Sequence, residues 1–185
     1  MSDWQLKTPV VFIIFNRPNT TAKVFEAIRQ AKPSELLVIA DGPRKRSQEA
    51  EKCAATRAII DRIDWECKVN KNYSDINLGC KKRVATGLDW VFSIVEEAII
   101  LEDDCLPDRT FFRFCEELLE KYRNDRRIMT ICGTNVMKEW KSEIQSYHYS
   151  YYGRGWGWAS WRRAWQHFDI STTNGHNSFI IAIFF

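Results

Sequence analysis

Three continuous apolar runs constrain the fold of this chain more than any other feature of its sequence. They are "PVVFIIF" at 9–15, "ELLVIADG" at 35–42 and "AIILE" at 98–102. Runs of β-branched and aromatic residues without polar alternation predict strands that are buried on both faces. Between these runs, apolar residues recur at helical spacing in the stretches 19–31, 47–63 and 79–97. Strands that alternate with helices in this way predict an α/β fold with a mostly parallel sheet and helices on both faces.

The same alternation continues along the chain as far as residue 133. The elements expected next are a weaker strand at 66–73, a helix at 109–125 and a strand at 127–133. The polar segment 134–155 shows no clear period. The stretch "WGWASWRRAWQHF" at 156–168 predicts a short aromatic helix, because Trp158, Trp161 and Trp165 would share one face that covers the sheet.

The bulk properties of the chain are those of a globular protein of one domain, with 185 residues of which 45% are hydrophobic and 28% charged. A net charge of +3 does not point to nucleic acid as the main partner, and the basic clusters at 43–46 and 123–127 are interpreted as solvated surface. The six cysteines include no C-x-x-C pair, which favours a reducing, cytoplasmic setting. The start "MSDWQLKTPV" lacks the core of a signal peptide, and "FIIAIFF" at 179–185 is far shorter than the ~20 residues of a spanning helix. We therefore expect no membrane span, and peripheral association with the inner face of a membrane stays open.

Polar residues follow three of the predicted strands at the point where each strand ends. Asn16 and Arg17 follow the first, Asp41 and Gly42 end the second, and the acidic triplet 102–104 ends the central one. Ligands of open parallel sheets bind outside the carboxyl ends of the strands. The sequence therefore predicts a binding site at this edge of the sheet.

The acidic triplet Glu102-Asp103-Asp104 needs a positive partner, because adjacent carboxylates repel one another. Mg²⁺ and Mn²⁺ prefer oxygen ligands and commonly share their coordination shell with waters and substrate phosphates. An acidic surface turn is the alternative interpretation of the triplet taken alone. Nearby, the guanidinium of Arg17 suits a phosphate or a base carbonyl, and Asp41 could accept hydrogen bonds from a base or a ribose. The segment "NLGCKKR" at 77–83 leads into the helix expected at 79–97, and the first amide groups of that helix would favour an anion; the alternative interpretation is a surface helix end.

These motifs together resemble glycosyltransferases of the GT-A fold, in particular the N-acetylglucosaminyltransferase I type and related bacterial nucleotide-diphospho-sugar transferases. The matching segments are "VFIIFNRP" at 11–18, "VIADGP" at 38–43, "NLGCKK" at 77–82, "ILEDDCLPDRTFFRFCEEL" at 100–118 and "GRGWGW" at 153–158. The resemblance implies a Rossmann-like GT-A domain, a nucleotide-sugar donor that is UDP-linked, and Mn²⁺ or Mg²⁺ as cofactor. It also implies a saccharide or glycolipid acceptor and a role in bacterial surface polysaccharide assembly.

The resemblance further implies a role for individual residues of this sequence. Asp104 is expected to contact the metal, and Glu102 and Asp103 to serve the ribose, the sugar or metal-bound water. The residues expected around the rest of the donor are Asn16, Arg17 and Asp41 at the nucleoside, Lys82 near the donor and Trp156 against the sugar ring. The three histidines have no ligand spacing, and no metal is assigned to them.

The end of the chain departs from the family pattern. Inverting glycosyl transfer needs a carboxylate that takes the proton of the acceptor hydroxyl. After Trp158 the sequence has one carboxylate, Asp169, which comes earlier than the family's base and is the one candidate for that role. Residues 170–185 contain no Asp, Glu, Lys or Arg. We therefore expect a donor-binding domain at 1–169 and an atypical tail at 170–185, which we interpret as a truncated acceptor region. With the acceptor region truncated, we expect glycosyl transfer to be weak or absent.

Two other functions stay open at this point. A sugar-1-phosphate nucleotidyltransferase shares the fold class, but such enzymes carry a glycine-rich phosphate loop after the first strand, whereas "FNRPNTT" at 15–21 has no glycine. A non-catalytic nucleotide-binding or scaffold domain would keep the fold and lose the chemistry. A lack of binding to UDP and UDP-sugars would favour the scaffold.

Overall fold

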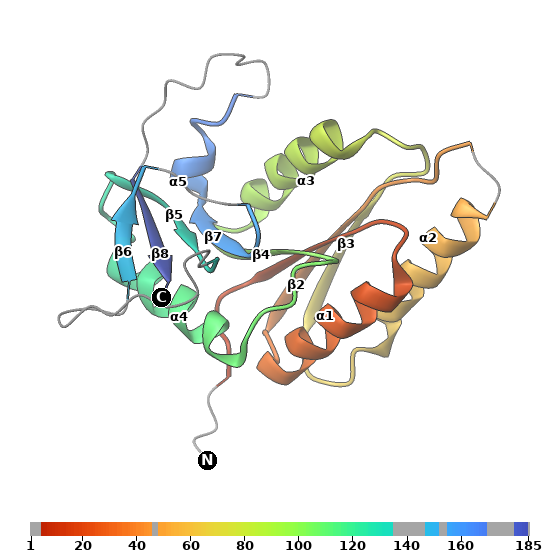
Figure 1. The fold of residues 1–185 in the computed structure, drawn as a ribbon, viewed down its shortest axis with the longest axis horizontal. Coiled ribbons are helices and arrows are strands. Elements are labelled where there is room, and N and C mark those ends of the chain that lie inside the picture. The colour runs from red at the N-terminus through yellow and green to blue at the C-terminus, as the bar shows by residue number, and fades with distance from the viewer. Residues whose placement is uncertain (1–4, 46–47, 135–146, 152–154, 170–179, 185) are drawn as a thin grey trace.

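The computed structural model describes residues 5–45, 48–134, 147–151, 155–169 and 180–184, and its centre is a mixed sheet with helices against both faces (Figure 1). The strands are β1 (Val10–Ile14), β2 (Glu35–Ala40), β3 (Lys68–Tyr73), β4 (Glu97–Glu102), β5 (Ile128–Cys132), β6 (Tyr147–Ser150), β7 (Trp158–Trp161) and β8 (Ile180–Phe184). The helices are α1 (Pro18–Ala31), α2 (Glu49–Ala58) with a 3₁₀ turn at Ile59–Arg62, α3 (Cys80–Ile94), α4 (Arg109–Lys121) and α5 (Arg162–Trp165).

The eight strands of the described chain lie in the order β3-β2-β1-β4-β7-β5-β8-β6. Four of the seven strand pairs are parallel, and three of these join β3, β2, β1 and β4 into one block. This confirms the predicted α/β fold with a mostly parallel sheet. The parallel block also aligns the carboxyl ends of its strands at one edge, as the site prediction requires.

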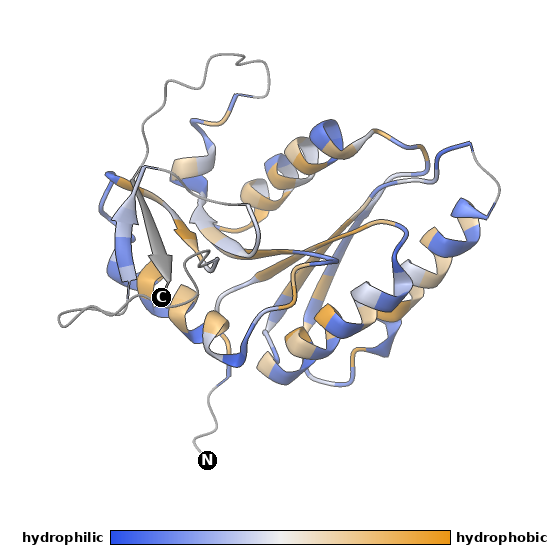
Figure 2. Ribbon diagram, viewed as in Figure 1, coloured by the Kyte–Doolittle hydropathy of each residue, from blue (hydrophilic) through white to orange (hydrophobic). Residues whose placement is uncertain are grey.

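Two apolar cores cover the faces of the sheet. Alternate residues of β1, such as Phe12, pack with α1 and α4 on one face, whereas Val11 packs with α3 on the other. Both residues are fully buried, which explains why these strands read as unbroken apolar runs. Figure 2 shows the resulting pattern, with hydrophobic colour along the central strands and hydrophilic colour on the outer sides of the helices.

The aromatic stretch 156–168, which was predicted to be one short helix, begins as a strand: Trp158–Trp161 form β7, and only Arg162–Trp165 form the helix α5, so the prediction is wrong for its first part. Trp158 and Trp161 are the ends of β7, which pairs antiparallel with β4 on one side and β5 on the other. Backbone hydrogen bonds to two neighbouring strands override the helical spacing of the tryptophans, and aromatic residues are favourable in strands. Trp161 is buried, and the rings of Trp158 and Trp165 lie 6.5 Å apart at their centroids.

Part of the predicted tail belongs to the sheet. Residues 180–184 form β8, which runs parallel to β5 and antiparallel to β6. Residues 170–179, in which the tail was predicted to begin, and Gly153 and Arg154 of the Gly-Trp motif lie outside the described residues. The domain boundary at 169 therefore stays a prediction. Within the ranges that the structure describes, no helix combines the length and apolar character needed to cross a bilayer.

Candidate functional site

A cavity of about 420 Å³ lies at the carboxyl ends of β1, β2 and β4, with the start of α3 as one of its walls. Five of the predicted site residues line it: Asn16, Arg17, Asp41, Glu102 and Asp103. The predicted convergence of strand ends is thus present in the fold. A larger groove of about 740 Å³ lies between α1 and the segment 106–109, and none of the predicted site residues lines it.

The positive group between the acids of the triplet is Arg17. Its Nη2 lies 2.8 Å from Oδ1 of Asp103, and its Nη1 lies 2.6 Å from Oδ2 of Asp104. The two acids differ in environment, since the Asp103 side chain is 2% exposed and that of Asp104 is 44% exposed. Asp103 also accepts a hydrogen bond from the backbone N–H of Phe15 at 3.1 Å. Asp103 is therefore fixed to the end of β1, whereas Asp104 faces solvent.

Glu102 is the least compensated acid of the triplet. It lines the cavity, is half-buried, and its carboxylate forms no hydrogen bond or ion pair with any residue that the structure describes. Burial and the negative charges of Asp104 and Asp103 raise the pKa of Glu102. Burial also raises the pKa of Asp103, against the opposing effect of Arg17. A further cation beside these carboxylates would reduce the repulsion between them and favour their charged forms.

The acids of the triplet fit a divalent cation in charge and in donor type. Three carboxylates facing one guanidinium leave two negative charges uncompensated, and their oxygens are the donors that Mg²⁺ and Mn²⁺ prefer. Over the described residues, His, Cys, Asp and Glu form no group of three that could enclose a metal ion. Mg²⁺ and Mn²⁺ are commonly held by one or two protein carboxylates when substrate phosphates complete the coordination shell.

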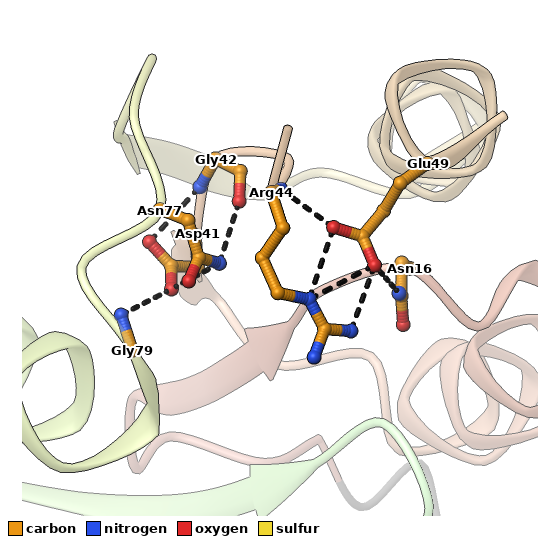
Figure 3. Close-up of polar contacts among 7 residues, drawn as sticks. All are labelled: Asn16, Asp41, Gly42, Arg44, Glu49, Asn77 and Gly79. Atoms are coloured by element: carbon orange, nitrogen blue, oxygen red, sulfur yellow. Dashed lines mark hydrogen bonds and ion pairs between the residues drawn. The ribbon is translucent and has the colours of Figure 1, made fainter. Parts of the chain in front are cut away.

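Asp41 connects the end of β2 to the segment that precedes α3 (Figure 3). Its Oδ1 accepts the backbone N–H groups of Gly42 and Leu78, each at 2.9 Å. Its Oδ2 accepts the side-chain amide of Asn77 at 3.0 Å and the N–H of Gly79 at 3.1 Å. Each oxygen thus receives two hydrogen bonds, which fills the acceptor capacity of a carboxylate. The predicted contact of Asp41 with a base or a ribose would have to replace one of these bonds.

The segment 74–79 passes directly over the end of β2. A Cβ atom at Gly42 would lie 2.5 Å from the backbone carbon of Ile76, so no side chain fits between the two backbones. The guanidinium of Arg57 joins the same elements, because its Nη2 donates to the carbonyl oxygens of Asp41 and Ser74. The cavity wall formed by this segment is therefore closely packed.

A second cluster holds Arg44 beside the cavity (Figure 3). Glu49 accepts hydrogen bonds from the side chain of Asn16 at 3.0 Å and from Nη2 of Arg44 at 2.7 Å. The hydrogen bonds from Arg44 lower the pKa of Glu49 to about 2. The Arg44 guanidinium also lies 5.3 Å from the ring centroid of Phe15. Arg44 belongs to the basic cluster at 43–46, which was interpreted as solvated surface. The one feature of the sequence that could have identified Arg44 as a site residue is its position two residues after Gly42.

The cation that lines the cavity from α3 is Arg83, not Lys82. Arg83 is buried and donates from Nε to the carbonyl of Ala40 at 3.2 Å and from Nη2 to the side chain of Asn72 at 2.7 Å. Burial lowers the pKa of Arg83, and the nearby charge of Asp41 opposes this effect. Lys82 is exposed and does not line the cavity, so the structure does not bring it together with the other predicted residues.

The two predicted residues from the end of the chain lie in different places. Trp156, which is 57% exposed, precedes β7 at the end where Trp158 pairs with Ile100, toward the carboxyl end of β4. Asp169 follows α5, and α5 begins where Trp161 pairs with Glu97 at the opposite end of β4. Figure 1 shows α5 beside the end of α3, whereas the cavity lies beside its start. This position does not suit the predicted role of Asp169 as base for a substrate in the cavity.

Comparison with known proteins supports the fold. No protein-family model and no curated protein sequence matches the chain. Among solved structures, a mannosyltransferase from Pyrobaculum calidifontis in complex with GDP-Man and Mn²⁺ is similar with a TM-score of 0.62 and 14% identity, over 92% of this chain and 49% of that one. A 4-diphosphocytidyl-2C-methyl-D-erythritol synthase from Anaerococcus prevotii is similar with a TM-score of 0.53 and 9% identity, over 90% and 80% of the two chains. The chain thus spans about half the length of the mannosyltransferase, and at these identities the similarity shows a shared fold.

The saturated carboxylate of Asp41 generates a stability prediction. Asp41→Asn replaces one acceptor by an N–H donor that faces the donors of the segment 77–79, so we expect a loss of about 1–3 kcal/mol in the free energy of unfolding. Asp75→Asn, at an exposed position of the neighbouring loop, is the matched control and should change it by less than ~0.5 kcal/mol. Urea denaturation measures both. Equal stability of the two variants would contradict the structural role of Asp41.

The low pKa of Glu49 generates a pH prediction. Because the folded-state value of about 2 lies below the ordinary value of 4.5, ionised Glu49 stabilises the fold above pH 4.5, and this contribution is lost as the pH falls toward 2. Glu49→Gln should therefore flatten the decrease in unfolding free energy over this pH range, as followed by urea denaturation. Glu51→Gln, an exposed position on the same helix, should keep the slope of the parent protein. A parent-like slope in Glu49→Gln would show that the Arg44–Glu49 pair does not contribute.

Proposed function

We propose that the cavity at the carboxyl ends of β1, β2 and β4 binds a nucleotide-sugar donor and that the protein is a glycosyltransferase. The observation that carries the proposal is the position of the acidic triplet with Arg17 at the sheet edge where this fold binds ligands. The fold similarity to a mannosyltransferase in complex with GDP-Man and Mn²⁺ supports it. Arg17, Arg44 and Arg83 line the cavity, where their guanidinium groups could donate hydrogen bonds to the phosphates of such a donor.

The residues of the triplet take different roles in this proposal. Asp104 is the exposed carboxylate that would hold Mn²⁺ or Mg²⁺, and the ion would supply charge neutralisation to the departing nucleoside diphosphate. Asp103 is buried and bonded to β1, so its role is to position Arg17. Glu102 presents a half-buried carboxylate to the cavity and suits a ribose or sugar hydroxyl.

The donor nucleotide and the transfer step are separate parts of the proposal. UDP is the nucleotide that the family resemblance implies, and GDP is the one bound by the similar mannosyltransferase. Asp169 is placed away from the cavity, so donor binding is proposed for this chain without an assigned base. A saccharide or glycolipid acceptor, a bacterial polysaccharide pathway and a cytoplasmic location at the inner membrane face stay predictions.

Nucleotidyl transfer is the second candidate function, because the fold is also similar to a diphosphocytidyl-methylerythritol synthase. The two reactions differ in their products, since nucleotidyl transfer releases pyrophosphate from a nucleoside triphosphate and glycosyl transfer or donor hydrolysis releases a nucleoside diphosphate. Incubation with UTP, CTP or GTP and a sugar-1-phosphate, in parallel with UDP-sugars and GDP-mannose, distinguishes them by the product formed. Binding without either product favours the non-catalytic domain.

Asp104 provides the sharpest test of the proposed site. Isothermal titration should detect binding of UDP or GDP that strengthens in the presence of Mn²⁺, and Asp104→Asn should weaken this metal-dependent binding by at least about tenfold. The free energy of unfolding of Asp104→Asn should differ from that of the parent by less than ~0.5 kcal/mol, because the side chain is exposed and removing its charge reduces repulsion within the triplet.

Asp64→Asn is the matched control, since Asp64 is an exposed acid that pairs with Arg29 away from the cavity. It removes the same charge and should bind nucleotide as the parent protein does. Metal-dependent nucleotide binding of parent strength in Asp104→Asn would contradict the assignment of the metal contact.

A further inference from the structure

We propose that Arg17 is the built-in counter-ion of the acidic triplet and that it gives up Asp104 when a divalent cation binds there, while it keeps Asp103. The inference rests on the proposed function in one respect: the released N–H groups of Arg17 would donate hydrogen bonds to the diphosphate of a nucleotide-sugar donor. Arg17 would thus couple the binding of the metal to the binding of the nucleotide.

The two ends of the guanidinium make unequal contacts. Nη2 pairs with the buried Asp103, whose other oxygen is bonded to the N–H of Phe15. Nη1 pairs with the solvent-exposed Asp104 at 2.6 Å. A buried charge pair loses much more on separation than an exposed pair, which contributes little to stability. The contact with Asp104 is therefore the one that can exchange.

The backbone of Arg17 is anchored, so the exchange needs a change of its side chain alone. Arg17 precedes the first turn of α1, and its carbonyl oxygen accepts the N–H of Thr21 at 3.0 Å and the hydroxyl of the same residue at 2.8 Å. The Arg17 side chain is about half exposed, which leaves it room to rotate about its inner contact with Asp103. One arm of the guanidinium can then turn from the triplet to an anion in the cavity that it already lines.

The charges determine the direction of the coupling. With Arg17 in place, an oxygen of Asp104 is engaged and a positive charge stands beside the position of an incoming cation. Both effects weaken metal binding to the free protein. A diphosphate that accepts hydrogen bonds from Arg17 removes this competition, so metal and nucleotide each strengthen the binding of the other.

The test measures Mn²⁺ affinity in the absence of nucleotide, by isothermal titration and by the electron paramagnetic resonance signal of free Mn²⁺. Arg17→Gln keeps a hydrogen-bond donor for Asp103 but removes the charge, and it should bind Mn²⁺ at least about tenfold more tightly than the parent protein. Arg17→Lys keeps the charge and should stay close to the parent. Arg29→Gln removes a positive charge from α1, the helix that follows Arg17, and should leave Mn²⁺ affinity unchanged because Arg29 pairs with Glu26 and Asp64.

The possible outcomes separate this inference from the proposed function. The counter-ion role is overturned if Arg17→Gln unfolds at the same temperature as the parent protein and binds Mn²⁺ no more tightly than the parent does. If Arg17→Gln does not fold, Arg17→Met takes its place in the same comparison. Tighter Mn²⁺ binding by Arg17→Gln, together with no binding of UDP or GDP by any variant, supports the counter-ion role and overturns the proposed function. Tighter Mn²⁺ binding combined with weaker binding of UDP or GDP in Mn²⁺ supports both.

Discussion

The parallel hydrogen bonding of β1 to β2 on one side and to β4 on the other is the constraint on which the rest of this structure depends. Its register places Ile14 beside Ala40 and Ile13 beside Glu102. The residues that follow each strand therefore emerge at the same level of the sheet. Charges that lie far apart in the sequence are brought together by this pairing, and their repulsion and attraction then determine the local structure of the edge.

The protein satisfies most of the acids at this edge with its own donors. Asp41 receives four N–H groups, Glu49 receives Arg44 and Asn16, and Asp103 receives Arg17 and the backbone of Phe15. Buried carboxylates require such partners, because an unpaired buried charge is costly. Glu102 differs from these three, because its carboxylate faces the cavity without a partner among the described residues. The surplus of negative charge is thus concentrated where a ligand can reach it.

The fold and the position of the cavity at the sheet edge could be predicted from the sequence because both follow from local patterns. Unbroken apolar runs identified β1, β2 and β4, and the polar residues after them identified the edge. The strand β7 was missed because Trp158–Trp161 fits a helical period, and its pairing with β4 and β5 is not a local property. The partnership of Arg17 with Asp103 and Asp104, 86 and 87 positions away, has no sequence pattern of its own, and the acids were expected to be balanced by a metal alone.

The close passage of the segment 74–79 over Gly42 gives one wall of the cavity a closely packed backbone. Backbone lies against backbone at this wall, and Asp41 and Arg57 join the layers, so this side offers a ligand a preformed surface. The cavity lining also includes the half-exposed Arg17, which pairs with the exposed Asp104. We therefore expect the closely packed wall to select ligands by their shape, whereas the half-exposed side chain of Arg17 can rotate when a ligand binds.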